Sequence, residues 1–203
     1  MRGVRLLDRT HQHQVVTILI AAFADDPLYA KVARTQEARR ALATFLFKKA
    51  INQQERVSGY VDNDILMGVA CVEKKHSKTN LKRMKPSFLW LCIRLFRHLS
   101  PGAFRFMTRY GRIIETGRKS PCHTLLWLAV MPENQGRGIG TALLDHVHQE
   151  AEADPKAVFV YLDTENERNL DYYKRFGYAL TGDTLIDDVK VYCMRKPLRE
   201  NQS

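Results

Sequence analysis

The spacing of apolar and polar positions divides the first third of the chain into a strand, two helices and a hairpin. Residues 3–8 read as a strand, and apolar positions in helical register follow Thr10, which we expect to cap that helix. The proline of residues 25–27 should end it, because proline disfavours helix in the residue before it. Apolar side chains on one face predict a second helix from Arg34 to Gln54.

A β-hairpin is predicted next, over RVSGYVDNDILMGVACVEKK at residues 56–75, because two β-rich runs flank the turn-forming residues 62–64. Pro86 suits the first turn of a helix that runs to about His98, where Pro101-Gly102 interrupts it. A further basic helix is expected over residues 103–116.

The remaining residues alternate between strand-like and helix-like runs. The predicted order is a strand at 124–130, a glycine-rich loop, a helix at 140–152, a strand at 157–162, a short helix at 166–176, and strands near 178–181 and 189–195. A hairpin followed by this alternation implies a mixed α/β sheet.

Composition supports a globular protein. The 203 residues are 45% apolar and 27% charged, which suits a single domain spanning residues 1–203. The N-terminus lacks the apolar core of a signal peptide, and no apolar run approaches the length of a membrane span, so we expect a cytoplasmic protein. The four cysteines are widely spaced and no Cys/His cluster occurs, so we expect no metal site.

The positive charge is concentrated in one segment. Residues 74–119 carry a net charge of +12, whereas the rest of the chain sums to −2. A polyanionic ligand, a membrane surface or a nucleic acid would each explain this excess, and a solvated basic face without a partner is the alternative.

The loop QGRGIG at residues 135–140 has the chemistry of an anion site. Its glycines allow backbone N–H groups to converge, Arg137 adds a positive charge, and the next helix begins there. The loop lacks the GK[ST] ending of a P-loop and does not fit GxGxxG. A diphosphate would fit, and a plain strand-to-helix turn is the alternative.

The segments on either side of this loop indicate a particular protein family, which the loop alone does not. LAVMPENQGRGIGTALLDHV and YLDTENERNLDYYKRFGY together resemble the acetyl-CoA-binding core of the GCN5-related N-acetyltransferase (GNAT) superfamily. The resemblance covers residues 124–178, and RNLDYYKRFGY…VYCMRKP looks most like the puromycin N-acetyltransferase-like branch. It implies a mixed, mostly antiparallel sheet of about six or seven strands flanked by helices, with an opening between the strands at 124–130 and 157–162.

The resemblance also implies residue roles for acetyl-CoA as co-substrate. Backbone groups of Leu128, Ala129 and Val130 would pair with the pantetheine arm. Asn166 and Asn169 would bind adjacent CoA groups, although Asn166 could simply cap the short helix. The pyrophosphate would lie on the loop residues Gln135, Gly136, Arg137, Gly138, Ile139, Gly140 and Thr141.

Direct attack of an amine on the thioester in a ternary complex is the implied mechanism. Tyr173 matches the tyrosine that protonates the departing thiolate, and a backbone N–H near Val130 would hold the oxyanion. His123 is the first candidate for the base because it precedes the opening and titrates near neutrality, with Glu73 and Glu115 as weaker candidates. An ordinary surface histidine is the alternative.

The acceptor side is read from segments outside the loop. Phe23, Asp26 and Tyr29 are the expected substrate-binding residues, with Asp26 attracting a cationic amine; packing and helix termination are the alternative roles. The basic helical insert at 86–118 is expected to pack on the core rather than lie on a membrane surface.

The predicted function is therefore an N-acetyltransferase for a primary amine, most simply of a small molecule. We expect a monomer or homodimer without a nucleic-acid partner. The alternatives are a protein lysine or N-terminal acetyltransferase, a non-catalytic acyl-CoA sensor on the same fold, and a nucleic-acid-binding module that uses the basic segment.

Overall fold

A seven-stranded sheet forms the centre of the protein in a computed structural model that describes residues 2–75, 86–118 and 121–198. Its strand order is β1-β2-β3-β4-β5-β7-β6. The strands are β1 (Gly3–Leu6), β2 (Arg56–Asp62), β3 (Ile65–Lys75), β4 (Cys122–Val130), β5 (Phe159–Thr164), β6 (Ala179–Ile186) and β7 (Val189–Pro197). Every neighbouring pair is antiparallel except β4 and β5, which are parallel. The predicted mixed, mostly antiparallel sheet is confirmed.

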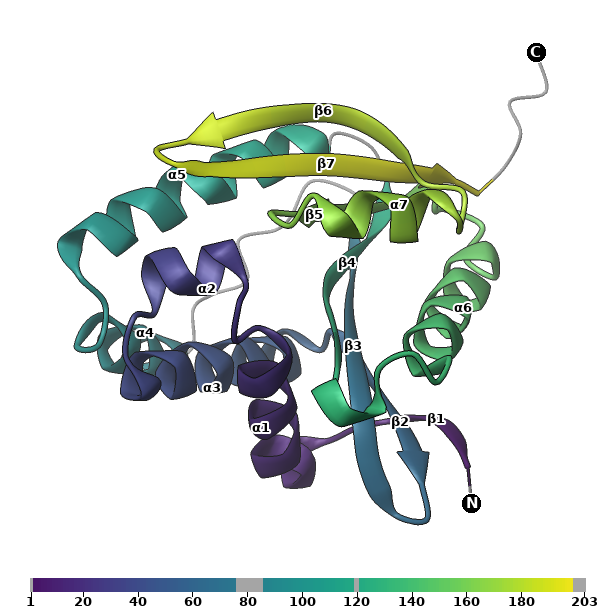
Figure 1. Ribbon diagram of the computed structural model, residues 1–203, viewed down its shortest axis with the longest axis horizontal. Coiled ribbons are helices and arrows are strands. Elements are labelled where there is room, and N and C mark those ends of the chain that lie inside the picture. The colour runs from purple at the N-terminus through teal and green to yellow at the C-terminus, as the bar shows by residue number, and fades with distance from the viewer. Residues whose placement is uncertain (1, 76–85, 119–120, 199–203) are drawn as a thin grey trace.

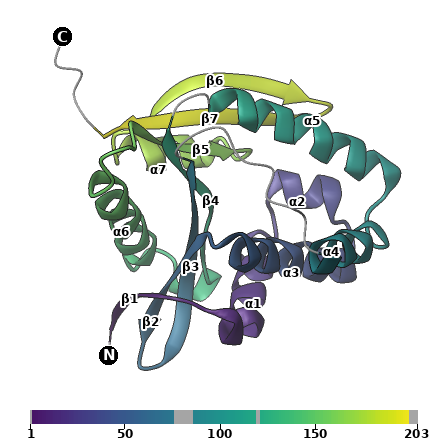
Figure 2. The same ribbon diagram turned by 180° about the vertical axis from the view of Figure 1, so that it is seen from behind.

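The helices cover both faces of this sheet. They are α1 (Gln12–Ala22), α2 (Pro27–Val32), α3 (Gln36–Gln53), α4 (Pro86–Phe96), α5 (Pro101–Gly117), α6 (Ile139–Glu152) and α7 (Arg168–Lys174). Figures 1 and 2 show α6 on one side of the central strands and α1 to α5 on the other. Buried side chains lie beneath the helices on both faces, with one set beneath α6 and another beneath α1 and α3.

The hairpin is confirmed, and its turn explains the register. Asn63 and Asp64 both have positive φ, at 47° and 62°. This is the backbone of a two-residue turn whose twist matches that of the flanking strands, and Asn and Asp tolerate it better than most residues.

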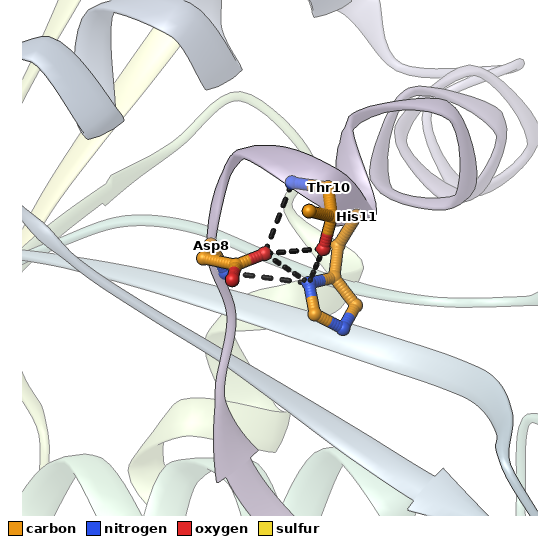
Figure 3. A network of polar contacts seen from close by, with 3 residues as sticks. All are labelled: Asp8, Thr10 and His11. Carbon is orange, nitrogen blue, oxygen red and sulfur yellow. Dashed lines mark hydrogen bonds and ion pairs between the residues drawn. The ribbon is translucent and has the colours of Figure 1, made fainter.

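The start of the first helical segment differs from the prediction. Asp8, not Thr10, is the capping residue: its carboxylate accepts hydrogen bonds from the backbone N–H and the hydroxyl of Thr10 and contacts the ring of His11 (Figure 3). A short 3-10 turn, η1 (Arg9–His11), therefore precedes α1. The expected cap was wrong because the aspartate two residues earlier offers the stronger, charged acceptor.

Proline 27 begins a helix as well as following one. The residues after it form α2, whose N-terminus is capped by Asp26 through a 3.1 Å hydrogen bond from the backbone N–H of Tyr29. The apolar spacing of residues 27–32 did not predict this short helix. The next helix is capped by Thr35 and is slightly shorter than predicted.

The basic insert folds as α4 and α5, and Pro101 occupies the first turn of α5 behind the cap Ser100. The expectation that the insert packs on the core holds for Leu91, Leu95 and Phe106, which are buried. Other apolar side chains of the insert are exposed, namely Trp90, Ile93, Phe96 and Phe104. Residues 76–85 and 119 of the basic segment lie outside the described residues. Within the described ranges, no helix is both long enough and apolar enough to cross a membrane.

Strands β4 and β5 separate part-way along their length. Their parallel pairing runs from Cys122 and Phe159 to Leu125 and Leu162, although β4 continues to Val130. A bulge lies at the same place, because Cys71 of β3 pairs with Trp127 while Val72 pairs with Leu125. The extra residue reverses which face of the sheet the later β4 side chains occupy. The predicted opening between these strands is confirmed.

Candidate functional site

Two cavities meet at the opening between β4 and β5. The loop cavity, about 800 Å³, is lined by the end of β4 and by the loop and helix that follow it. The helix cavity, about 850 Å³, is lined by α2, α5 and both separated strands. Five residues line both: Phe23, Asp26, Leu128, Asn169 and Tyr173. A molecule in one cavity can therefore reach a molecule in the other at this junction.

The glycine loop has a backbone that other residues would strain. Gly136 and Gly138 have φ of 74° and 78°, in the left-handed region. Gly138 is also the N-cap of α6 and supplies no side-chain acceptor, so the first N–H groups of that helix stay available to a ligand. At Gly140 a Cβ would lie 2.9 Å from the hydroxyl of Tyr172. Glycines thus fit the positions at which an anion needs close backbone approach.

Side chains of the loop point in different directions. Gln135 donates from Nε2 to the carbonyl of Val130, at 3.2 Å, which fixes the loop against the end of β4. Arg137 donates to Asn134 at 2.8 Å, is exposed, and is absent from the lining of the loop cavity. Every other residue predicted to bind the cofactor lines that cavity.

The two asparagines lie where β5 passes into α7. Asn166 accepts a hydrogen bond from the backbone N–H of Arg168 at 3.1 Å, a local turn contact, whereas the N-cap position of α7 is Glu167. Asn169 donates to the hydroxyl of Thr164 at 3.0 Å. Both line the loop cavity, and Asn169 also lines the helix cavity.

Tyr173 stands at the junction of the cavities. Its ring packs against those of Tyr172 and Tyr178, with centroids 5.3 and 5.7 Å away. Burial, followed by the charge of neighbouring groups, raises the pKa of its hydroxyl well above the ordinary value. The hydroxyl is therefore protonated at neutral pH, as a proton donor must be.

The three residues predicted for the acceptor side are brought together. Phe23 and Tyr29 stack with ring centroids 5.1 Å apart, and both line the helix cavity with Asp26. Burial raises the pKa of Asp26, whose carboxylate also caps α2. Asp26 therefore combines the packing role and the cavity position that sequence analysis treated as alternatives.

A group of polar residues in the helix cavity was missed by sequence analysis. The hydroxyl of Tyr110, on α5, lies within hydrogen-bond distance of the carboxyl groups of Asp163 and Glu165, on and just after β5. Burial raises the pKa of Asp163, and burial together with the charge of Asp163 raises the pKa of Glu165 to about 8. No sequence signal links Tyr110 to residues so distant along the chain.

His123 does not lie at the junction. It precedes the bulge and faces α6, where its Nε2 contacts a carboxylate oxygen of Asp154 at 2.8 Å, and its side chain is fully buried. It lines neither cavity. The structure thus keeps His123 away from the junction, because His123 lies on the part of β4 that is still paired with β5, opposite Val160.

The weaker candidates for the base have a common partner. Arg118 lies 2.8 Å from a carboxylate oxygen of Glu73 and 3.9 Å from one of Glu115. Glu115 lines the helix cavity and Glu73 does not. Across the described ranges, no three His, Cys, Asp or Glu side chains come together as metal ligands would.

The elements that form this site match a known protein family. Residues 103–180 match the acetyltransferase (GNAT) domain family. The GNAT match begins in α5, includes the separated strands, the glycine loop and α7, and ends at the start of β6. It therefore covers both walls of the opening and the element that carries Tyr173.

Solved structures share the fold over nearly the whole chain. The polyamine N-acetyltransferase of Drosophila melanogaster is 17% identical with a TM-score of 0.68, covering 97% of this chain and 100% of that one. The PaiA N-acetyltransferase of Thermoplasma acidophilum, in complex with coenzyme A, is 14% identical with a TM-score of 0.61, covering 97% and 99%. The ribosomal-protein-S18-alanine N-acetyltransferase of Escherichia coli is 14% identical with a TM-score of 0.57, covering 100% and 99%. At these identities the likeness establishes the GNAT fold alone.

Proposed function

We propose that this protein is a GNAT acetyltransferase that transfers the acetyl group of acetyl-CoA to a primary amine. The observation that carries the proposal is the meeting of two cavities at Tyr173, between strands that separate after Leu125 and Leu162. Two substrates bound in separate cavities can react directly where the cavities join. The GNAT match over the same elements supports this assignment.

Acetyl-CoA would occupy the loop cavity. The positive φ values of Gly136 and Gly138 and the uncapped start of α6 suit the pyrophosphate. The edge of β4 beyond Leu125 no longer pairs with β5, which leaves room for the pantetheine arm to lie along Leu128, Ala129 and Val130. In this arrangement, Asn166 and Asn169 bind the arm at the opposite wall.

Tyr173 would act as the acid that protonates the departing thiolate. It lines both cavities, and its hydroxyl carries a proton at neutral pH that it can donate to the thiolate. A backbone N–H near Val130 would stabilise the oxyanion.

The acceptor amine would enter the helix cavity, and we favour a small molecule. Phe23, Asp26 and Tyr29 form part of the lining, and Tyr29 is only 2% exposed, so this cavity reaches well below the surface. A protein amine is the alternative, because the GNAT fold serves both kinds of acceptor in the proteins compared above. The puromycin N-acetyltransferase-like branch and the cytoplasmic location stay predictions.

Two other functions have less support. A non-catalytic acyl-CoA sensor would leave the helix cavity without a role. A nucleic-acid-binding module would explain the exposed arginines of α5 and leave both cavities unused.

An assay of CoA release with acetyl-CoA and a panel of primary amines, followed by mass spectrometry of the product, tests the proposed function. Release of CoA with an acetylated amine is expected, and failure of every amine would contradict it.

A further inference from the structure

The contact between Tyr110, Asp163 and Glu165 constrains how many protons these groups hold. A phenol has one proton to donate, and a carboxylate can only accept. The Tyr110 hydroxyl lies within hydrogen-bond distance of both carboxyl groups. It can donate to one of them, so the second contact is a hydrogen bond only if the other carboxyl group is protonated and donates to the phenol oxygen. One proton shared between the two carboxyl groups would satisfy both contacts.

The surroundings favour the same state. Both carboxyl groups are mostly buried and face the helix cavity, where two like charges close together are unfavourable. Asp26, before α2, adds a negative charge that raises the pKa of Glu165, and Arg118, after α5, lowers the pKa of Asp163. On α7, the charges of both carboxyl groups contribute to the raised pKa of Tyr173. A cation that enters this space would allow the second carboxyl group to ionise.

The pair is also placed for the reaction. Asp163 and Glu165 follow Leu162, the last β5 residue that pairs with β4, and they line the cavity that reaches Tyr173. His123, by contrast, lies on the part of β4 that is still paired with β5. A primary amine is mostly an ammonium ion at neutral pH and has to lose a proton before it attacks.

We propose that Asp163, Glu165 and Tyr110 bind the ammonium group of a cationic acceptor and take up the proton that it loses before attack. This inference rests on the proposed acetyl transfer. It names the acceptor as a positively charged amine, such as a diamine. It also assigns a function to α5, which supplies Tyr110.

The proton balance is complete without another reactant. The ionised carboxylate removes one proton from the ammonium group, and the neutral nitrogen then bonds to the thioester carbon. The carbon–sulfur bond breaks, its electron pair leaves on sulfur, and Tyr173 protonates that sulfur. The nitrogen gives its second proton to the Tyr173 phenolate, and the carboxyl group later releases its proton to water. An ammonium ion and acetyl-CoA thus become an amide, the CoA thiol and one proton.

With a cation that does not titrate, any dependence of binding on pH comes from ionisation of the protein and not of the ligand. Butyltrimethylammonium keeps its charge at every pH and has no proton to lose. Its affinity, measured by calorimetry between about pH 6 and pH 9, should rise by about tenfold as Glu165, with a pKa of about 8, ionises. Absence of binding, or an affinity independent of pH, would overturn the proposal.

Variants show whether the pair is responsible. Glu165→Gln should remove the pH dependence, whereas the matched control Glu167→Gln, at an exposed position that lines neither cavity, should keep it. Tyr110→Phe removes a donor to the ionised carboxylate, so the rise in affinity should move to higher pH. Because Tyr110→Phe leaves both carboxyl groups in place, it also decides the matter if Glu165→Gln fails to fold. The same pH dependence in wild type, Tyr110→Phe and Glu165→Gln would refute the inference.

Turnover gives the second readout. Butylamine, 1,4-diaminobutane and 4-aminobutanoate share a primary amine and differ in the charge at the far end. We expect kcat/KM to be highest for the diamine and lowest for the amino acid, by about tenfold or more, and Glu165→Gln to reduce this preference. Turnover without any preference for charge would overturn the inference and leave the proposed acetyl transfer intact. Binding of butyltrimethylammonium with the expected pH dependence, but no turnover of any amine, would contradict the proposed function alone.

Discussion

Leu125 and Leu162 are the last residues at which β4 and β5 pair with each other, and both cavities open from the point where these strands part. The bulge opposite Cys71 and Val72 lies at the same level of the sheet. Past it, Trp127 packs beneath α1 and α3, whereas Leu128 packs on the side of α6. One irregularity in β4 therefore coincides with the opening and sets the face of the sheet on which the later side chains pack.

Loss of the Tyr173 hydroxyl should slow the transfer and leave donor binding unchanged. For Tyr173→Phe we expect kcat to fall by about 10² to 10⁴, the usual contribution of a positioned acid. The Kd for acetyl-CoA should stay within about twofold, because the ring still packs against Tyr172 and Tyr178. Stopped assays of CoA release and calorimetry measure these two quantities.

Tyr192→Phe is the matched control for that comparison. Tyr192 is also buried, on β7, and it lines neither cavity. Its variant should keep the wild-type kcat. Equal rates for wild type and Tyr173→Phe would remove Tyr173 from the chemistry.

Asp26→Asn should weaken acceptor binding with little effect on folding. Asparagine caps helices about as well as aspartate, so the bond from the Tyr29 backbone N–H can persist. Loss of the negative charge beside the junction should raise KM for 1,4-diaminobutane by about threefold to tenfold, with a smaller change in kcat. Asp64→Asn, at a surface turn, removes the same charge elsewhere and should leave KM unchanged. Steady-state kinetics and thermal melts report both effects, and an unaltered KM in Asp26→Asn would exclude Asp26 from acceptor recognition.

Stability at mildly acid pH should depend on His148. Its side chain is buried and its Nε2 lies 3.0 Å from the hydroxyl of Tyr178, and burial with the charge of Lys196 lowers the pKa of His148 to about 4. The unfolded chain takes up this proton below about pH 6.5, whereas the folded protein resists it. The contribution of His148 to the free energy of unfolding should therefore be constant above that pH. It should fall toward pH 4, by up to about 1 kcal/mol per pH unit after allowance for solvent screening.

His148→Gln isolates this effect. Glutamine can still bond to Tyr178 and does not titrate, so the melting temperature of wild type should fall relative to the variant between about pH 7 and pH 5. Thermal melts at matched ionic strength measure the difference. Parallel pH curves for the two proteins would show that His148 carries no such proton linkage.

The donor side was predictable because its signals are local. The glycines, Asn166, Asn169 and Tyr173 lie within one continuous stretch, and the resemblance supplied their spacing. All of them line the loop cavity, whereas the Arg137 side chain is held outside it by Asn134. A side chain's direction within a loop depends on its neighbours in space, and the pattern does not contain that information.

The acceptor side was predictable only in part, because it is assembled from distant segments. Phe23, Asp26 and Tyr29 follow one another closely in the sequence, and all three line the helix cavity, but their role in acceptor binding stays a prediction. Tyr110 meets Asp163 and Glu165 across more than fifty residues, and nothing in the periodicity of α5 indicates that contact. For His123 the decisive fact is that it lies on the part of β4 still paired with β5, and where the two strands separate follows from tertiary packing rather than from sequence spacing.

Binding of acetyl-CoA to the loop cavity is the central claim, and a calorimetric titration of wild type against Gly138→Ala tests it most directly. A Cβ at Gly138 meets no atom within 4 Å, but φ there is 78°, so alanine would shift the backbone N–H groups without a clash. Gly182→Ala, on the exposed strand β6 and also without a close neighbour, is the control. We predict one acetyl-CoA per wild-type chain with a Kd on the order of micromolar, at least about tenfold weaker binding in Gly138→Ala, and no change in Gly182→Ala. No binding to wild type, or equal affinity in all three proteins, would contradict the account.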